Sequence, residues 1–152
     1  MIAAGLGARV VAIDVADGAL EAARKAGAEV LLRAGGDVRE ATGGGAHVSL
    51  DAIGAEPALA ASIAALRKRG RHVQVGLLPE PPRVPMDIVI ARELELLGSH
   101  GMAARTYPEL LELVEAGTLR PGDLVTREIP LDDAPRALAA MGDTPGVTII
   151  RP

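Results

Sequence analysis

Cysteine is absent from the 152-residue chain, and Tyr107 is its only aromatic residue. Without cysteine the chain can form neither disulfides nor thiolate zinc sites. With one aromatic side chain and a formal net charge of -4, it lacks the stacking surface and the basic field that nucleic-acid binding requires. The composition, 49% hydrophobic and 24% charged, is that of a globular protein rather than a membrane protein. No positively charged, apolar leader opens the sequence, so we expect a cytoplasmic protein.

Common catalytic motifs are also absent. The chain contains no Gly-x-Ser-x-Gly elbow, Walker loop, His-Glu-x-x-His or Cys-x-x-Cys, so hydrolase, nucleotide-triphosphatase and metalloenzyme functions have no motif support. A zinc site needs three or four converging ligands. His47 and His72 fall in or beside expected strands, where packing within a sheet accounts for them. The sequence therefore offers neither a catalytic constellation nor a metal site.

Expected strands and helices alternate along the chain. Short apolar segments rich in β-branched residues are separated by segments with helical spacing, and glycine and proline punctuate both. The expected strands are residues 9–14, 29–32, 47–51, 71–75, 94–99, 125–129 and 147–150. The expected helices begin near residues 17, 38, 57, 87, 106 and 132. This alternation implies right-handed crossovers and a mostly parallel sheet, so the fold class is α/β.

Punctuating residues set the expected limits of the helices. The helix that starts near Pro57 should end with Arg67–Arg69, before Gly70. Thr106 and Glu109 have the spacing of a capping box. The expected N-caps of other helices are Asp17, Asp87 and either Asp132 or Asp133, and the last helix is expected to run through Leu138 and Met141 to Gly142.

Asp14 is the first candidate binding residue, because it ends an expected parallel strand. A carboxylate at this place can accept hydrogen bonds from the adenosine ribose hydroxyls of NAD, and it repels a 2′-phosphate. It can equally cap the turn that follows, and position alone leaves both roles open. His100 follows a strand end as well, where ligands of open α/β sheets bind, and a purely structural role is equally open for it.

Gly5 and Gly7 invite a dinucleotide-binding interpretation, which their context disfavours. That fingerprint requires a strand before the glycines, a helix after them and a third glycine. Here Gly5-Leu6-Gly7 leads into a strand, and position 10 is valine. We therefore expect these two glycines to end a preceding helix.

Short segments distributed over nearly the whole chain follow one another in a distinctive order and spacing. They are Leu6–Asp14, Gly27–Glu29, Thr42–Ala46, Leu50–Gly54, Gly70–Leu77, Leu97–Ser99, Ile129–Ala134 and Ala137–Leu138. In this order they resemble the medium-chain zinc-dependent alcohol dehydrogenase family. The resemblance implies an oxidoreductase that interconverts an alcohol and an aldehyde or ketone with NAD(P), with zinc polarising the substrate oxygen.

The resemblance also implies cofactor-binding roles for individual residues. Asp14 would hold the adenosine ribose, Ala52, Ile53 and Gly54 would line the adenosine side, Gly76 and Leu77 would approach the nicotinamide ribose, and Ser99 and His100 would lie beside the carboxamide. An acidic residue at position 14 favours NAD over NADP.

What the matched region lacks is equally informative. Family members carry a zinc-binding catalytic domain and then a first strand with its glycine-rich turn before this region. The resemblance thus implies that residues 1–152 are a partial NAD(P)-binding domain, an incomplete Rossmann-like, doubly wound sheet with no zinc ligands. In the strand order 3-2-1-4-5-6 the missing first strand is the central one, so two strand edges would be exposed. Gly146-Val147 stands where many family members have Gly-Arg near the cofactor phosphates, so we expect no second phosphate contact.

Two functions of different classes follow. The first is the cofactor-binding part of a zinc-type NAD(P)-dependent alcohol dehydrogenase, inactive as an isolated chain. The second is a non-catalytic remnant with weak or no nucleotide binding, or a module that forms homodimers through the apolar strand at Leu94–Leu97. A Rossmann-like methyltransferase is disfavoured, because the resemblance continues beyond the sheet core.

Overall fold

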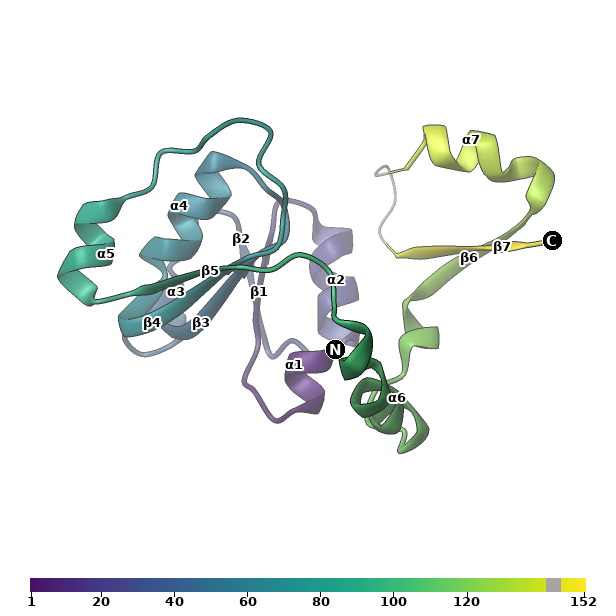
Figure 1. Ribbon diagram of the computed structural model, residues 1–152, viewed down its shortest axis with the longest axis horizontal. Coiled ribbons are helices and arrows are strands. Elements are labelled where there is room, and N and C mark those ends of the chain that lie inside the picture. Colours follow the sequence, from purple (N-terminus) through teal and green to yellow (C-terminus); the bar gives the residue numbers. More distant parts are fainter. Residues whose placement is uncertain (142–145) are drawn as a thin grey trace. The chain divides into compact units, whose positions relative to one another are not determined.

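The computed structural model describes residues 1–141 and 146–152, so the expected helix end at Gly142 lies outside the described residues. The chain divides into two compact units. Residues 1–34 and 103–152 form unit 1, and residues 35–102 form unit 2. Both units contain parallel strands joined through helices, as the α/β class requires (Figure 1).

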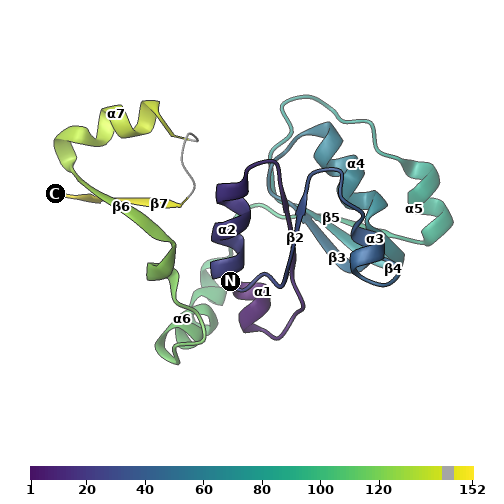
Figure 2. The ribbon, with the colours of Figure 1, turned by 180° about the vertical axis from the view of Figure 1, so that it is seen from behind.

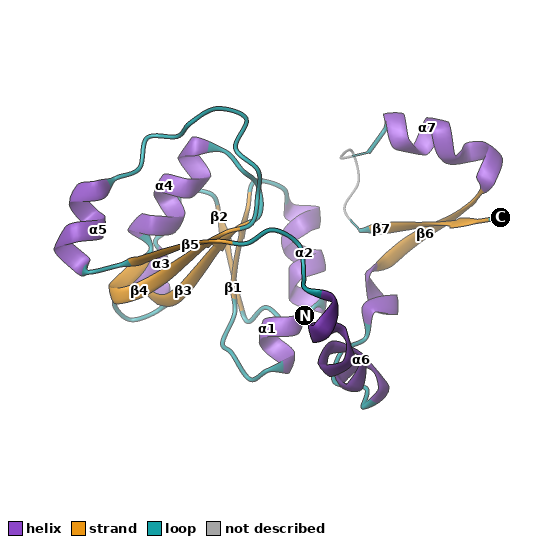
Figure 3. Cartoon of the chain, viewed as in Figure 1, coloured by secondary structure: helices purple, strands orange, loops and turns teal. Residues whose placement is uncertain are grey.

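Unit 2 contains a three-stranded parallel sheet in the order β3-β4-β5 (Figure 3). Its elements are α3 (Val38–Ala41), β3 (Ala46–Asp51), α4 (Glu56–Ala64), β4 (Leu66–Gln74), α5 (Met86–Arg92) and β5 (Glu95–Gly98). Leu59 and Ile63 of α4 and Val89 of α5 form a buried cluster. Val48 and Leu50 of β3 are exposed, because their side chains lie on the opposite face of the strand from those of Ser49 and Asp51.

Unit 1 contains two separate pairs of parallel strands, seen from the other side in Figure 2. The first pair joins β1 to β2, with α2 as the crossover, and the second joins β6 to β7. The elements are α1 (Ile2–Gly5), β1 (Val11–Asp14), α2 (Asp17–Lys25), β2 (Val30–Arg33), α6 (Tyr107–Glu115), β6 (Val125–Pro130), α7 (Ala134–Ala139) and β7 (Val147–Arg151), with short 3-10 turns at Ala104–Thr106, Pro121–Leu124 and Leu131–Asp133.

The beginning of the chain confirms the helical interpretation of its glycines. Helix α1 ends at Gly5, and Gly7 follows with φ at +83°, in the left-handed region that favours glycine. A Cβ atom at Gly5 would lie 2.9 Å from a methyl carbon of Leu119, so the missing side chain lets the helix pack closely. The Gly5-Leu6-Gly7 segment is therefore a helix end and not a dinucleotide fingerprint.

The expected end of α4 is wrong. The helix ends at Ala64, and Arg67–Arg69 belong to β4. Contacts distant in sequence explain this early end: Ala46 N–H donates to the Ala65 carbonyl, and the Arg92 guanidinium donates to the Ala64 and Leu66 carbonyls, each at 2.8 Å. These groups satisfy carbonyls that another helical turn would have used.

The expected capping box is also wrong. Thr106 occupies the N-cap position of α6, but its hydroxyl donates to the Ala103 carbonyl at 2.7 Å and caps nothing in the helix. Two of the other predicted N-caps are wrong as well. Asp17 and Asp87 lie inside the first turns of α2 and α5, and Asp133 precedes α7 without a side-chain cap bond.

Candidate functional site

The turns that follow β3 and β4 touch each other through their backbones. Gly54 has φ at +77°, and a Cβ atom there would lie 2.1 Å from the Leu77 carbonyl oxygen. A Cβ atom at Gly76 would lie 2.3 Å from the Gly54 nitrogen. Neither position can carry a side chain without displacing backbone. Thus the structure brings together both predicted glycine turns, Ala52–Gly54 and Gly76-Leu77, at the carboxyl edge of the sheet.

The Asp51 carboxylate fixes the first of these turns. Its Oδ1 atom accepts the N–H groups of Ile53 at 2.8 Å and Gly54 at 3.2 Å. Its own carbonyl accepts the N–H groups of Val75 and Gly76 from the second turn. Asp51 is only 3% exposed, so these bonds lie where water competes little.

Gln74 connects Asp51 to the second turn and to a buried histidine. Its amide nitrogen donates to Asp51 Oδ2 at 3.0 Å and to the Gly76 carbonyl at 2.8 Å. Its carbonyl oxygen lies 3.1 Å from His72 Nε2. With the amide nitrogen committed to two acceptors, the oxygen must accept, and so this network assigns the proton to His72 Nε2.

The other ring nitrogen of His72 completes the network. Its Nδ1 atom lies 3.0 Å from the Ser62 hydroxyl and 3.3 Å from the Ser49 hydroxyl. Within the described residues, no buried side-chain nitrogen or oxygen lacks a hydrogen-bond partner. A satisfied buried network of this kind fixes one arrangement of the groups it joins. His72 therefore serves the packing of the sheet, as the sequence predicted.

Two opposing effects act on the pKa of Asp51. Burial raises this pKa, but hydrogen bonds from Gln74, Ile53 N–H and Gly54 N–H lower it more. The charge of nearby His72 acts in the same lowering direction. The net pKa lies below its ordinary value, so the clamp on both turns holds an ionised carboxylate at neutral pH.

Two bulky apolar side chains project from the clamped turns into solvent. Ile53 is 69% exposed and Leu77 is 79% exposed, although the buried cluster of unit 2 lies nearby in sequence. Ligands of open parallel sheets bind at the carboxyl ends of the strands, where both residues lie. These side chains offer a planar ring or a ribose an apolar surface.

The segment after β5 joins the same edge. Ser99 N–H donates to the Gln74 carbonyl at 2.9 Å, which places the backbone of Ser99 beside the end of β4. His100 follows and is exposed. The structure thus places Ser99 with the two turns, and the role of His100 stays a prediction.

Asp14 belongs to unit 1 and lies at the carboxyl end of β1. Its Oδ1 atom accepts the Ala16 N–H at 2.9 Å, so Asp14 does cap the turn that follows. In the part of the chain that the structure describes, Oδ2 has no protein partner. The turn-capping role therefore leaves an oxygen available for a ligand.

Arg33, which the sequence interpretation missed, lies next to Asp14 in the strand register. Its guanidinium donates to the Val15 carbonyl at 2.6 Å and pairs with Asp17 at 2.5 Å. The available signal was its place at the end of the second strand, beside a strand that ends in Asp14.

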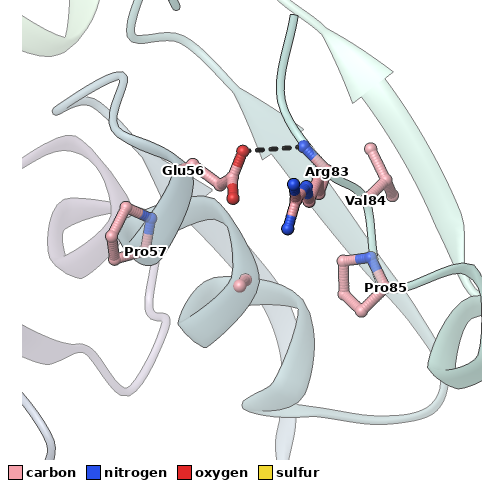
Figure 4. Close-up of a pocket in the computed structure, with 6 residues that line it drawn as sticks. Glu56, Pro57, Arg83, Val84 and Pro85 are labelled. Carbon is pink, nitrogen blue, oxygen red and sulfur yellow. Dashed lines mark hydrogen bonds between the residues drawn. The ribbon is translucent and has the colours of Figure 1, made fainter.

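A shallow hollow of about 280 Å³ lies elsewhere in unit 2 (Figure 4). Its lining is Glu56, Pro57, Ala60, Arg83, Val84 and Pro85. The Glu56 carboxylate accepts the Arg83 N–H at 2.9 Å and thereby ties the proline-rich loop to α4. No predicted site residue lines this hollow, and the Glu56 carboxylate in it is already paired with the Arg83 backbone N–H.

Zinc does not fit the described residues. Across residues 1–141 and 146–152, no three His, Cys, Asp or Glu side chains are grouped so that they could hold a metal ion. His47 lies in β3 with its Nε2 atom 2.6 Å from Arg67, and His72 is committed to the network above.

Among the helices of residues 1–141 and 146–152, none combines the length and apolarity needed to cross a membrane.

Comparison with known proteins identifies the family. Residues 1–116 match the zinc-binding dehydrogenase family, so the chain belongs to this family. It is 30% identical over 138 residues to an NAD-dependent alcohol dehydrogenase of Sulfurisphaera tokodaii, a match that covers 87% of this chain and 39% of that protein. The chain thus spans about two fifths of the length of this curated relative.

Solved structures show the same fold. A 2R,3R-butanediol dehydrogenase from Bacillus subtilis superposes with a TM-score of 0.85 at 22% identity, over 95% of this chain and 44% of that one. A putative zinc-binding dehydrogenase from Sinorhizobium meliloti, bound to NADP, gives a TM-score of 0.82 at 24% identity, over 95% of this chain and 45% of that one. The Rossmann-like part of such dehydrogenases is therefore the fold of this chain.

Proposed function

We propose that the chain binds NAD as the cofactor-binding portion of a zinc-type alcohol dehydrogenase. The observation that carries the proposal is the exposure of Ile53 and Leu77 on two turns that buried Asp51 clamps together. Burial of an exposed apolar side chain against a ligand lowers the free energy of binding, and turns whose backbone is already fixed lose little entropy when the ligand binds. The NAD-dependent relative and the NADP-bound structure support this cofactor class.

Each predicted residue is assigned the role that the family resemblance implies. The free oxygen of Asp14 accepts from the adenosine ribose, and Ala52, Ile53 and Gly54 line the adenosine side. Gly76 and Leu77 approach the nicotinamide ribose, and Ser99 and His100 lie beside the carboxamide. The nicotinamide supplies hydride transfer when bound, while the residues of this chain bind and orient it.

The same proposal includes a single NAD(P)-binding domain whose sheet is completed by a strand from outside residues 1–152. Two observations support it. Within the described residues β1 pairs only with β2, and β3 pairs only with β4, so each has one unpaired edge. The zinc ligands and the proton relay of the reaction would come from the same outside segment, so residues 1–152 alone would show no turnover.

A second candidate function is homodimerisation through β5. Among the residues that the structure describes, this strand pairs with β4 on one side only, and Leu96 and Leu97 are 38% and 45% exposed. An apolar edge strand adds readily to a second copy of itself. Dimerisation is compatible with cofactor binding, and it stands alone if nucleotide binding fails.

Titration with NADH, followed by the fluorescence of the nicotinamide, tests cofactor binding. We expect saturable binding that Leu77→Ser weakens roughly fivefold, the ~1 kcal/mol that partial burial of a leucine contributes. Leu111→Ser is the matched control, because Leu111 is also exposed but lies on α6. An unchanged signal at millimolar NADH would contradict the proposal and leave the dimerisation function.

A further inference from the structure

An ion pair joins Arg33 to Asp17 next to Asp14, the residue proposed to hold the adenosine ribose. Asp14 ends β1 and Arg33 ends β2, and these two residues are partners in the strand register. The Arg33 guanidinium spans the turn after Asp14, since it contacts the Val15 carbonyl and Asp17, the first residue of α2. A cation thus lies beside the carboxylate that is expected to hold the ribose.

A guanidinium next to the ribose matters because NADP differs from NAD by a 2′-phosphate. Asp14 alone repels that phosphate, whereas a free arginine at this place accommodates it. Arginine binds phosphate through two parallel hydrogen bonds, and a carboxylate occupies the same donors. In this chain Asp17 already occupies one end of the Arg33 guanidinium and the Val15 carbonyl occupies another.

We propose that Asp17 and Arg33 form a latch that sets the choice between NAD and NADP, an inference that rests on the proposed cofactor binding. With the latch closed, Asp17 neutralises Arg33 and the charge of Asp14 excludes the 2′-phosphate. Neutralising Asp17 releases the guanidinium and leaves one cation against one carboxylate. The site then takes the 2′-phosphorylated cofactor.

The exposure of the pair makes the latch easy to open. The side chains of Arg33 and Asp17 are 61% and 79% exposed, and ion pairs this exposed contribute little to stability. Substitution of Asp17 should therefore change ligand choice with little effect on the fold. The thermal transition by circular dichroism measures that effect for every variant.

Isothermal titration with adenosine 2′,5′-bisphosphate and with 5′-AMP separates the two ligand classes without any turnover. We expect Asp17→Asn to bind the bisphosphate about tenfold more tightly than the unaltered chain, with 5′-AMP affinity changed less than about twofold. Adding Arg33→Gln to Asp17→Asn should abolish this gain. Asp123→Asn is the matched control, because it breaks an exposed pair with Arg120 in the same unit.

The outcomes test the role of the Asp17–Arg33 pair independently of NADH binding. A bisphosphate affinity that Asp17→Asn leaves unchanged, or a gain that survives Arg33→Gln, overturns the latch even if the unaltered chain binds NADH. A chain that fails to bind NADH contradicts the proposed function, while an Arg33-dependent gain for the bisphosphate in Asp17→Asn still supports the latch. Absence of bisphosphate binding in Asp17→Asn overturns it.

Discussion

The amide nitrogen of Gln74 lies 3.0 Å from Asp51 Oδ2, so a side chain of β4 binds the carboxylate that ends β3. The same nitrogen donates to the Gly76 carbonyl in the next turn. Since Asp51 also holds the N–H groups of Ile53 and Gly54, the Gln74 amide links both candidate binding turns. The positions of the exposed apolar groups are therefore set by a buried polar network.

Replacing Gln74 by leucine should loosen both turns. The change leaves Asp51 Oδ2 and His72 Nε2 without a partner, which costs about 1–3 kcal/mol of unfolding free energy. Urea unfolding followed by circular dichroism measures the loss, and hydrogen exchange should quicken at the Ile53 and Gly54 amides. Glu80→Leu is the exposed control, for which we expect a change within about 0.5 kcal/mol. Equal effects of the two substitutions would contradict the role of Gln74.

Stability should fall in acid because of Asp51. The folded-state pKa of this carboxyl lies below its ordinary value of 3.8, because the hydrogen bonds that lower it outweigh the burial that raises it. Its stabilising contribution is therefore fully present above the unfolded-state pKa and is lost as the pH falls through the lower folded-state pKa. We call the loss of unfolding free energy at low pH the acid limb, and we expect Asp51→Asn to make it less steep. Urea midpoints between neutral pH and pH values below the ordinary pKa measure the change.

Glu128 provides the contrast for the acid limb. A hydrogen bond from Arg151, followed by the attraction of its charge, lowers the pKa of Glu128, but this pair lies on the surface. Salt screens such a pair, whereas it screens buried Asp51 much less. Glu128→Gln should therefore leave the acid limb nearly unchanged at high salt. An acid limb that responds equally to both substitutions would contradict the assignment to Asp51.

Gly76 and Gly98 should respond oppositely to alanine. A Cβ atom at Gly76 would lie 2.3 Å from the Gly54 nitrogen, so the two turns must separate, at about 1–3 kcal/mol. A Cβ atom at Gly98 meets nothing within 4 Å, and Gly98→Ala should be neutral or slightly stabilising. Thermal melts compare their stabilities, and NADH titration shows whether separated turns lose the ligand. A neutral Gly76→Ala would mean that the turns do not need to touch.

The sequence predicted where strands end better than where helices end. Asp14 and Asp51 each end an apolar, β-branched segment, and both lie at strand ends in the structure. The end of α4 was mispredicted because Arg67–Arg69 before Gly70 has the local pattern of a helix end. What decides it is distant in sequence: the pairing of Ala46 with Leu66 and the contact of Arg92 with helix-end carbonyls.

The site shows the same division between local and distant signals. The glycine turns were predictable from their place after strands. The function of Gln74 was not, because it depends on Asp51 across the sheet and on His72 two residues before it on the same face. Arg33 became a candidate only once the register placed it beside Asp14. Register and side-chain direction come from tertiary packing, which local patterns do not encode.

The β5 edge should support a dimer that one charge disrupts. Leu96 and Leu97 are exposed on a strand that, in the described residues, pairs with β4 alone, so a second copy can add its own β5 there. Light scattering after size exclusion should give twice the chain mass of 15.6 kDa for the unaltered chain and the mass of one chain for Leu97→Lys. Leu111→Lys, an exposed leucine on α6, should leave the dimer intact. A monomeric unaltered chain, or dissociation by both substitutions alike, would show that β5 is not the interface.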